Sequence, residues 1–142
     1  MVAHGLQYVA QASPHNYRDL MMKAKKAAAA DGPAVLNVMA PCPRGWRSDG
    51  AEGIDLAREA VNTCYWPLFE YEDGEYRLTY RPQHKLPLIP WLKRQGRFAH
   101  LFKPGNEETL AAIEAYVGRE WEKLLAKIRH LRQLRGSLEA AD

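Results

Sequence analysis

A strand–helix–strand pattern near the N-terminus constrains the fold of this chain more than any other feature. Residues 8–12 form a short run rich in strand formers, which ends at the turn signal Ser13-Pro14. Residues 15–30 then predict a helix, and the nearly continuous apolar run 34–39 predicts a strand buried on both faces. Two strands joined through a helix by short loops form a βαβ unit, whose strands are parallel and whose crossover is right-handed.

The predicted helix carries apolar residues at spacings of three and four, which form one apolar face. These residues are Tyr17, Leu20, Met21, Ala24 and Ala28. Two parallel strands by themselves can neither cover both of their faces nor protect their edges. We therefore expect the βαβ unit to be the end of a larger parallel sheet.

The middle of the chain predicts a second helix and a hairpin. Residues 54–62 form the helix, with Ile54, Ala57 and Val61 on one side. The runs 66–71 and 76–80 are rich in aromatic and β-branched residues, and an Asp-Gly pair lies between them. This combination is typical of a β-hairpin.

The C-terminal part predicts an arm and a long helix. Residues 81–105 contain four prolines, and we expect an extended, irregular arm that drapes over another subunit, with a short helix near residues 90–93. Residues 107–135 predict a helix of about 40 Å, longer than a domain of this size is wide (~30 Å), so its last turns are expected to pack on a partner or to fray. Its apolar stripe comprises Leu110, Ile113, Val117, Trp121, Leu124, Leu125, Ile128 and Leu131.

Composition excludes several classes of protein. The 142 residues are 46% hydrophobic and 26% charged, as in globular domains, and no apolar run reaches the ~18 residues of a membrane span. The net charge of +3 is too small to predict binding to nucleic acid. The N-terminus lacks the pattern of a signal peptide. We therefore expect a soluble, cytoplasmic protein that contacts neither nucleic acid nor a membrane.

The two cysteines, Cys42 and Cys64, have no spacing that makes a complete metal site, and an intracellular setting argues against a disulfide. Cys42 lies between two prolines in a stiff loop after the second strand, where ligands gather in open parallel sheets. Its position suits a metal-bound thiolate, but the spacing alone favours a plain buried cysteine. Cys64 is interpreted as a small core residue.

No nucleotide-binding, zinc-protease, hydrolase or EF-hand motif is present, and the five histidines show no ligand spacing. The loop that carries Cys42 also contains Arg44, Trp46 and Arg47. These side chains could bind a phosphate or a base by charge and stacking. The alternative is an ordinary loop in which Trp46 covers the core.

Four segments of the sequence are similar to one known family. Residues 32–46 contain Gly-Pro-Ala, a strand and Ala-Pro-Cys-Pro-Arg-Gly-Trp, and they resemble a segment of the β subunit of 2-oxoacid:ferredoxin oxidoreductases, above all the pyruvate type. Residues 8–14, 60–70 and 76–82 resemble further segments of that subunit in the same order. The resemblance is collinear over about residues 1–130 and covers the C-terminal half of the family's β subunit.

The resemblance implies a thiamine-diphosphate-binding α/β fold that holds one [4Fe-4S] cluster. On the family's pattern, Cys42 matches the fourth cysteine of the cluster, so the resemblance favours the metal-ligand interpretation of this residue. The three other cluster cysteines and the Gly-Asp-Gly motif that holds Mg²⁺ and diphosphate have no counterpart in this chain. No residue here is therefore expected to bind thiamine diphosphate or to act catalytically.

The implied reaction is the oxidative decarboxylation of a 2-oxoacid with coenzyme A, or its reverse, with electrons passing through iron–sulfur clusters to ferredoxin. The implied partners are the remaining half of the β subunit and the α, γ and δ subunits. Residues 1–63 are expected to end the thiamine-diphosphate-binding domain, and residues 64–142 to form a C-terminal extension. The isolated chain is expected to be inactive. The alternative is a non-catalytic interaction or assembly module derived from the same fold.

Overall fold

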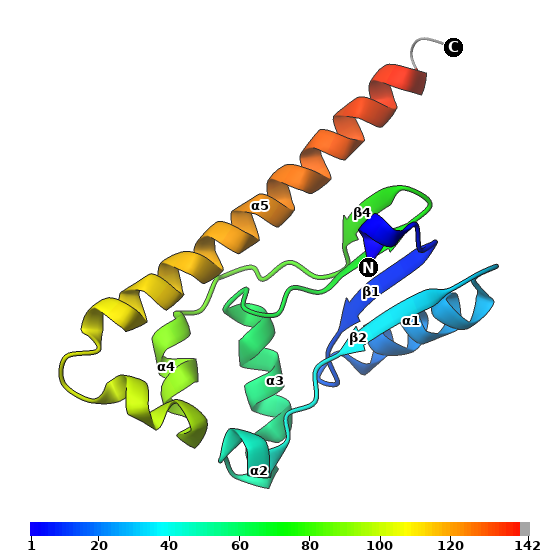
Figure 1. The fold of residues 1–142 in the computed structure, drawn as a ribbon. Coiled ribbons are helices and arrows are strands. Elements are labelled where there is room, and N and C mark those ends of the chain that lie inside the picture. The colour runs from blue at the N-terminus through cyan, green and yellow to red at the C-terminus, as the bar shows by residue number, and fades with distance from the viewer. Residues whose placement is uncertain (140–142) are drawn as a thin grey trace.

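The computed structural model of the chain describes residues 1–139. Its centre is a four-stranded sheet with the strand order β2-β1-β3-β4 (Figure 1). Strand β1 (Tyr8–Ala12) leads through helix α1 (Tyr17–Ala29) to strand β2 (Ala34–Val38). Strands β1 and β2 are parallel, with Tyr8 opposite Ala34. The predicted βαβ unit is confirmed.

The predicted hairpin is also confirmed. It consists of β3 (Phe69–Glu72) and β4 (Glu75–Leu78). Asp73 and Gly74 have positive φ angles of 50° and 85°, as a two-residue turn between twisted strands requires. Strand β3 pairs with β1 in the antiparallel direction, so the hairpin extends the parallel pair into a mixed sheet.

Strand β1 is the buried centre of the sheet, whereas β2 lies at its edge. Tyr8, Ala10 and Ala12 are at most 2% exposed. In β2, residues 34–36 are only half-buried, and Asn37 and Val38 are exposed. The prediction that residues 34–39 are buried on both faces is therefore wrong for this strand. The physical reason is that no other strand pairs with its outer edge within residues 1–139.

The apolar face predicted on α1 does not pack on the sheet. Tyr17 is 60% exposed and Met21 is 55% exposed, and only Lys23 of this helix is fully buried. Lysines face the sheet because strand β3 presents the carboxylates of Glu70 and Glu72 beneath the helix, where Lys26 pairs with both. The remaining members of the predicted face are exposed or half-buried: Leu20, Ala24 and Ala28.

A cluster of helices adjoins the sheet. It comprises α2 (Pro43–Trp46), η2 (Gly50–Glu52), α3 (Gly53–Asn62), α4 (Leu88–Lys93) and η3 (Gly96–Phe102), and a single turn, η1 (Val2–His4), precedes β1. In α3, Ala57 and Val61 are buried as predicted, but Ile54 is 49% exposed, because Leu56 and Ala60 occupy the core instead. The buried residues of this cluster are Met39, Trp46, Leu56, Ala57, Ala60, Leu88, Trp91, Leu92 and Val117.

The proline-rich segment 81–105 is more regular than predicted. Its short helix, α4, is confirmed, but residues 96–102 also form a helix, η3. Trp91 is 1% exposed, and its indole N–H donates to the carbonyl oxygen of Leu56 at 2.9 Å. Leu88, Trp91 and Leu92 of α4 therefore belong to the core of this chain, and Phe98 and Phe102 of η3 pack partly buried against it.

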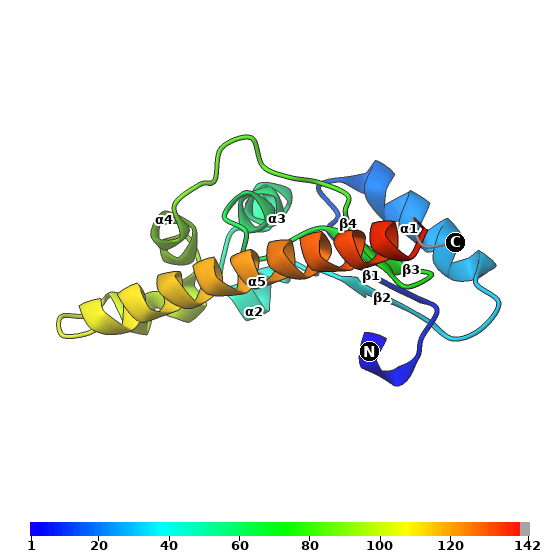
Figure 2. The ribbon, with the colours of Figure 1, turned by 90° about the horizontal axis from the view of Figure 1, so that it is seen from above.

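Helix α5 (Glu107–Glu139) runs diagonally along the molecule and links the helical cluster to the hairpin (Figures 1 and 2). Its predicted apolar stripe is confirmed, since Val117, Trp121, Leu125 and Ile128 are buried. The ammonium of Lys127 lies 4.3 Å from the centre of the Tyr76 ring in β4. No helix among the described residues combines the length and the apolarity needed to cross a bilayer.

Candidate metal-ligand loop

The loop that carries Cys42 begins where β2 ends. The backbone N–H of Met39 donates to the carbonyl oxygen of Ala12 at 3.1 Å, and this bond ties the start of the loop to the end of β1. The loop therefore lies at the carboxyl ends of both parallel strands (Figure 1). This is the edge at which ligands bind in open α/β sheets.

The backbone around Cys42 is fixed by local hydrogen bonds and by its two proline neighbours. The N–H of Cys42 donates to the carbonyl oxygen of Ala40 at 2.8 Å, and the carbonyl oxygen of Cys42 accepts from the N–H of Trp46 at 2.8 Å. Cys42 is thus the N-cap residue of α2, in an extended conformation. Its thiol is exposed and free. A stiff backbone that presents an exposed thiol can offer a ligand to a group held by another polypeptide.

An aromatic and cationic stack anchors the other end of the loop. Trp46 is 8% exposed and packs edge-on against Trp91, with ring centres 6.2 Å apart. The guanidinium of Arg97 lies over the Trp46 ring, 4.3 Å from its centre. The side-chain oxygen of the fully buried Gln95 accepts a hydrogen bond from this guanidinium at 2.6 Å. Burial lowers the pKa of Arg97. The packing of Trp46 agrees with its interpretation as a core residue. Arg44 and Arg47 are exposed.

A close approach of two backbones completes this anchor. The N–H of Gly96 donates to the carbonyl oxygen of Arg47 at 3.1 Å. A Cβ atom at position 96 would lie 2.8 Å from the Cβ atom of Arg47 and 2.9 Å from its carbonyl oxygen. Only glycine allows η3 to approach the end of α2 so closely. The Cys42 loop is therefore held in place by a segment about 50 residues further along the chain.

The two cysteines have contrasting surroundings. Cys64 is 4% exposed and packs with Trp121 and Leu125, and burial raises the pKa of its thiol. This matches the interpretation of Cys64 as a small core residue. Cys42 is the cysteine that a metal centre outside this chain could reach.

The surroundings of Cys42 fit one corner of a shared iron–sulfur cluster. Iron–sulfur clusters of the [4Fe-4S] type take four thiolates. Among residues 1–139, no group of three or more Cys, His, Asp or Glu side chains is arranged to hold a metal. The loop supplies a single exposed thiol, which suits a cluster whose other ligands come from a different polypeptide segment.

A second polar cluster lies on the α1 face of the sheet and was not predicted. The hydroxyl of Tyr8 donates to Glu70 at 3.0 Å, and the ammonium of Lys26 contacts Glu70 and Glu72 at 2.8 Å each. Arg77 of β4 pairs with the same two carboxylates at 3.1 and 2.5 Å. The sequence does carry a signal for this cluster. Glu70 and Glu72 alternate along a strand, and Lys23 and Lys26 lie three residues apart on a helix.

The pKa values in this cluster reflect burial opposed by pairing. Burial alone would raise the pKa of Glu70, but hydrogen bonds from Lys26 and Tyr8 lower it below its usual range. Burial, together with Glu70, raises the pKa of Tyr8. Burial lowers the pKa of Lys23, although Asp19 opposes that shift from 2.7 Å. The cluster is thus a neutralised network that holds α1 on the sheet.

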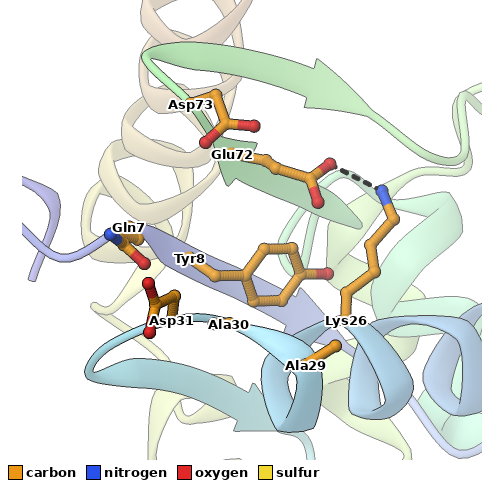
Figure 3. Close-up of a pocket in the computed structure, with 8 residues that line it drawn as sticks. All are labelled: Gln7, Tyr8, Lys26, Ala29, Ala30, Asp31, Glu72 and Asp73. Atoms are coloured by element: carbon orange, nitrogen blue, oxygen red, sulfur yellow. Dashed lines mark hydrogen bonds and ion pairs between the residues drawn. The ribbon is translucent and has the colours of Figure 1, made fainter.

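A cavity of about 380 Å³ opens beside this network (Figure 3). Tyr8 and Lys26 line it, together with acidic side chains from the hairpin and from the loop after α1. Tyr8 is the first residue of β1, so the cavity lies at the opposite end of that strand from the Cys42 loop. It is therefore separate from the candidate metal-ligand loop.

The βαβ unit, the mixed sheet and the helices around it define an α/β fold, and the Cys42 loop lies at the carboxyl ends of its parallel strands. No family model matches the sequence. The chain is 44% identical over 124 residues to the pyruvate synthase subunit PorB of Methanothermobacter thermautotrophicus, covering 87% of this chain and 42% of that subunit. It is 40% identical over 126 residues to PorB of Thermotoga maritima, covering 88% of this chain and 39% of that subunit.

A relative that is named for a different substrate matches at a similar identity. The ketoisovalerate oxidoreductase subunit VorB of Pyrococcus horikoshii is 40% identical over 126 residues, covering 87% of this chain and 39% of that subunit. The chain thus spans about two fifths of the length of the curated relatives it matches. By sequence it corresponds to part of the β subunit of a 2-oxoacid:ferredoxin oxidoreductase, which confirms the predicted resemblance.

Proposed function

We propose that this chain acts within a 2-oxoacid:ferredoxin oxidoreductase as part of its β subunit, and that Cys42 supplies one thiolate ligand of a [4Fe-4S] cluster. The observation that carries the proposal is the exposed thiol of Cys42, held in a stiff loop at the carboxyl ends of β1 and β2. When bound, such a cluster accepts and releases single electrons. The complex would convert a 2-oxoacid, such as pyruvate, to an acyl-coenzyme A and pass electrons to ferredoxin.

The role of this chain's residues in that function is to position the thiol. The prolines beside Cys42 restrict its backbone, and the stack of Trp46, Trp91 and Arg97 holds the loop against the helical cluster. The buried Gln95 fixes the guanidinium of Arg97. Thiamine diphosphate and Mg²⁺ would be bound by the remainder of the subunit, so the isolated chain is proposed to be inactive.

The experiment compares two cysteine variants in the assembled oxidoreductase. We expect Cys42→Ala to remove one cluster, seen as a loss of about four iron atoms per complex and of one EPR signal. Cys64→Ala should leave the iron content unchanged, because Cys64 is buried in a cluster with Trp121 and Leu125. Unchanged iron in Cys42→Ala would refute the ligand assignment. Viologen reduction with pyruvate by the purified chain alone would refute its proposed inactivity.

A second candidate function is a non-catalytic assembly module built on the same fold. The exposed apolar residues on α1 favour this alternative, because an exposed apolar face is a typical docking surface. The same experiment separates the two functions. A complex that contains this chain but has the same iron content with Cys42→Ala would support the assembly module.

A further inference from the structure

A cavity of about 300 Å³ lies where helix α5 crosses the end of strand β4 (Figures 1 and 2). We name it the arginine cavity. Leu125 and Ile128 of α5 are 8% and 6% exposed, and they form its apolar floor together with Leu78, the last residue of β4. The other side chains that line it are exposed arginines: Arg81, Arg129 and Arg132. An apolar floor and three guanidinium side chains therefore share one cavity that solvent can enter.

Two separate elements bring the arginines together. Arg129 and Arg132 lie three residues apart on one face of α5, and Arg81 lies three residues beyond the end of β4. The position of α5 against β4 is fixed close to the cavity, because the ammonium of Lys127 donates to the hydroxyl of Tyr76 at 3.0 Å. The arginine cavity is therefore a feature of the tertiary fold and not of the helix alone.

The three cavity arginines differ from the other cations in this part of α5. Lys123 pairs with Glu120 at 2.7 Å, and Arg135 pairs with Glu75. Among the described residues, none forms an ion pair or a side-chain hydrogen bond with a cavity arginine. A guanidinium is always charged in proteins, so three of them in one cavity repel one another. A bound oxyanion would offset this repulsion and supply hydrogen-bond acceptors.

We infer that the arginine cavity binds a small phosphate ester, with the phosphate held by the guanidinium groups and the organic group on the apolar floor. A guanidinium binds phosphate oxygens in pairs, through two parallel N–H donors. A phosphate monoester carries a charge of about −1.5 to −2 at pH 7, which balances three positive charges better than one carboxylate does. The volume of about 300 Å³ is at the small end of the range for ligand pockets, so the ligand is a small molecule.

This inference goes beyond the proposed function and is independent of the role of Cys42. The arginine cavity lies beside β4, whereas the Cys42 loop follows β2, and these are the two opposite edge strands of the sheet. The phosphate ester and the metal centre therefore belong to different sites, and the two proposals can fail separately.

The test is the binding of phenyl phosphate to the full chain, measured by isothermal titration calorimetry. We expect one site, and we expect Arg129→Gln and Arg132→Gln each to weaken binding by about tenfold or more. Arg119→Gln is the matched control, because Arg119 is an exposed arginine of the same helix outside the cavity, and it should change the affinity by less than about twofold. Absence of binding, or an equal loss with Arg119→Gln, would overturn the inference.

Further probes test the chemistry of the ligand. Inorganic phosphate and benzoate should both bind more weakly than phenyl phosphate, because the first lacks an apolar group and the second carries a single charge. Equal binding of either probe would refute a phosphate ester as the class of ligand. A glutamate-rich peptide that binds more tightly than phenyl phosphate would assign the cavity to an acidic protein segment, and would refute it as well.

A second measurement uses the unaltered chain, so it does not depend on the folding of any variant. Phenylglyoxal modifies exposed guanidinium groups, and mass spectrometry locates the modified residues. Phenyl phosphate should slow the modification of the three cavity arginines together and leave that of Arg119 unchanged. Uniform protection of all four arginines would contradict the inference.

The same measurement in the assembled oxidoreductase separates a ligand site from a subunit contact. Protection of the cavity arginines should again require phenyl phosphate. Protection without any added ligand would assign the cavity to a contact with another subunit and would overturn the inference. The proposed function would fail separately, through the iron content of Cys42→Ala.

Discussion

The guanidinium carbon of Arg97 lies 4.3 Å from the centre of the Trp46 ring and 4.6 Å from that of Phe98. Arg97 belongs to η3, and Trp46 ends the short helix that Cys42 caps. The stack therefore links the proline-rich segment to the candidate metal-ligand loop. The contribution of the Arg97 contacts to stability and the close approach of Gly96 to the backbone of Arg47 can be tested by separate substitutions.

Replacing Arg97 by methionine should destabilise the chain by about 1–2 kcal/mol. The change removes a partly buried cation–π contact and the hydrogen bonds to Gln95, while keeping an apolar side chain of similar length. Urea unfolding followed by tryptophan fluorescence measures the loss. Arg44→Met is the control, because Arg44 is an exposed residue of the same loop, and it should change stability by less than about 0.5 kcal/mol.

Gly96→Ala should cost about 1–3 kcal/mol, because the new methyl group would meet the backbone of Arg47 at 2.9 Å. The loss should appear as a lower urea midpoint with an unchanged slope. Gly118→Ala is the matched control within α5, where the nearest atom is the ammonium of Lys85 at 3.9 Å. That variant should gain about 0.5–1 kcal/mol. Equal effects of the two changes would contradict the proposed close approach.

Lys23→Met should destabilise the chain by about 3 kcal/mol, because it leaves a largely buried Asp19 carboxylate without its partner. The carbonyl oxygen of Gln11 also loses its donor at 2.8 Å. Adding Asp19→Asn should recover part of the loss. A double-mutant cycle, measured by chemical unfolding, is expected to give a coupling energy of about 1–3 kcal/mol. Additive effects would show that the pair is not coupled.

The stability of the chain should depend on the ionisation of Glu70. Its pKa in the folded state is lowered from the usual 4.5, so the folded state binds this proton less tightly than the unfolded state does. The stabilisation is therefore complete above the usual pKa and is lost as the pH falls through the lowered value. Unfolding midpoints measured from pH 7 down to about pH 3 should fall less steeply for Glu70→Gln than for the wild type. The exposed Glu108→Gln should follow the wild type.

The two thiols should react at very different rates with Ellman's reagent. Cys42 is exposed, whereas Cys64 is 4% exposed and burial raises the pKa of its thiol. Because the thiolate is the reacting form, we expect one fast and one slow phase in the folded chain. Cys42→Ser should remove the fast phase, and denaturant should make both thiols fast. A fast phase that persists in Cys42→Ser would contradict this assignment.

Local patterns predicted the elements of this fold well. The Asp73-Gly74 pair placed the hairpin, and the apolar spacing from Leu110 to Leu131 placed α5. These features are encoded by residues close together in sequence. The pairing of β3 with β1 was not predicted, because it joins residues about 60 positions apart and has no local signature.

The candidate site likewise combines features with a local sequence pattern and contacts between residues far apart in sequence. The prolines and the resemblance directed attention to Cys42, but not to the residues that anchor its loop. Gln95, Gly96 and Arg97 come from a segment predicted to be irregular, and their contacts with Arg47 and Trp46 exist only in three dimensions. The pattern on α1 was read correctly as apolar, yet its surroundings could not be derived from this chain's sequence.

The central position of β1 has a consequence for synthesis on the ribosome. One edge of β1 can pair as soon as residues 34–38 emerge, but the other edge must wait for residues 69–72. Until then, Tyr8 also lacks its carboxylate partner, Glu70. The nascent chain therefore carries an apolar strand with one unpaired edge during the synthesis of about 30 further residues, a period in which misfolding is favoured.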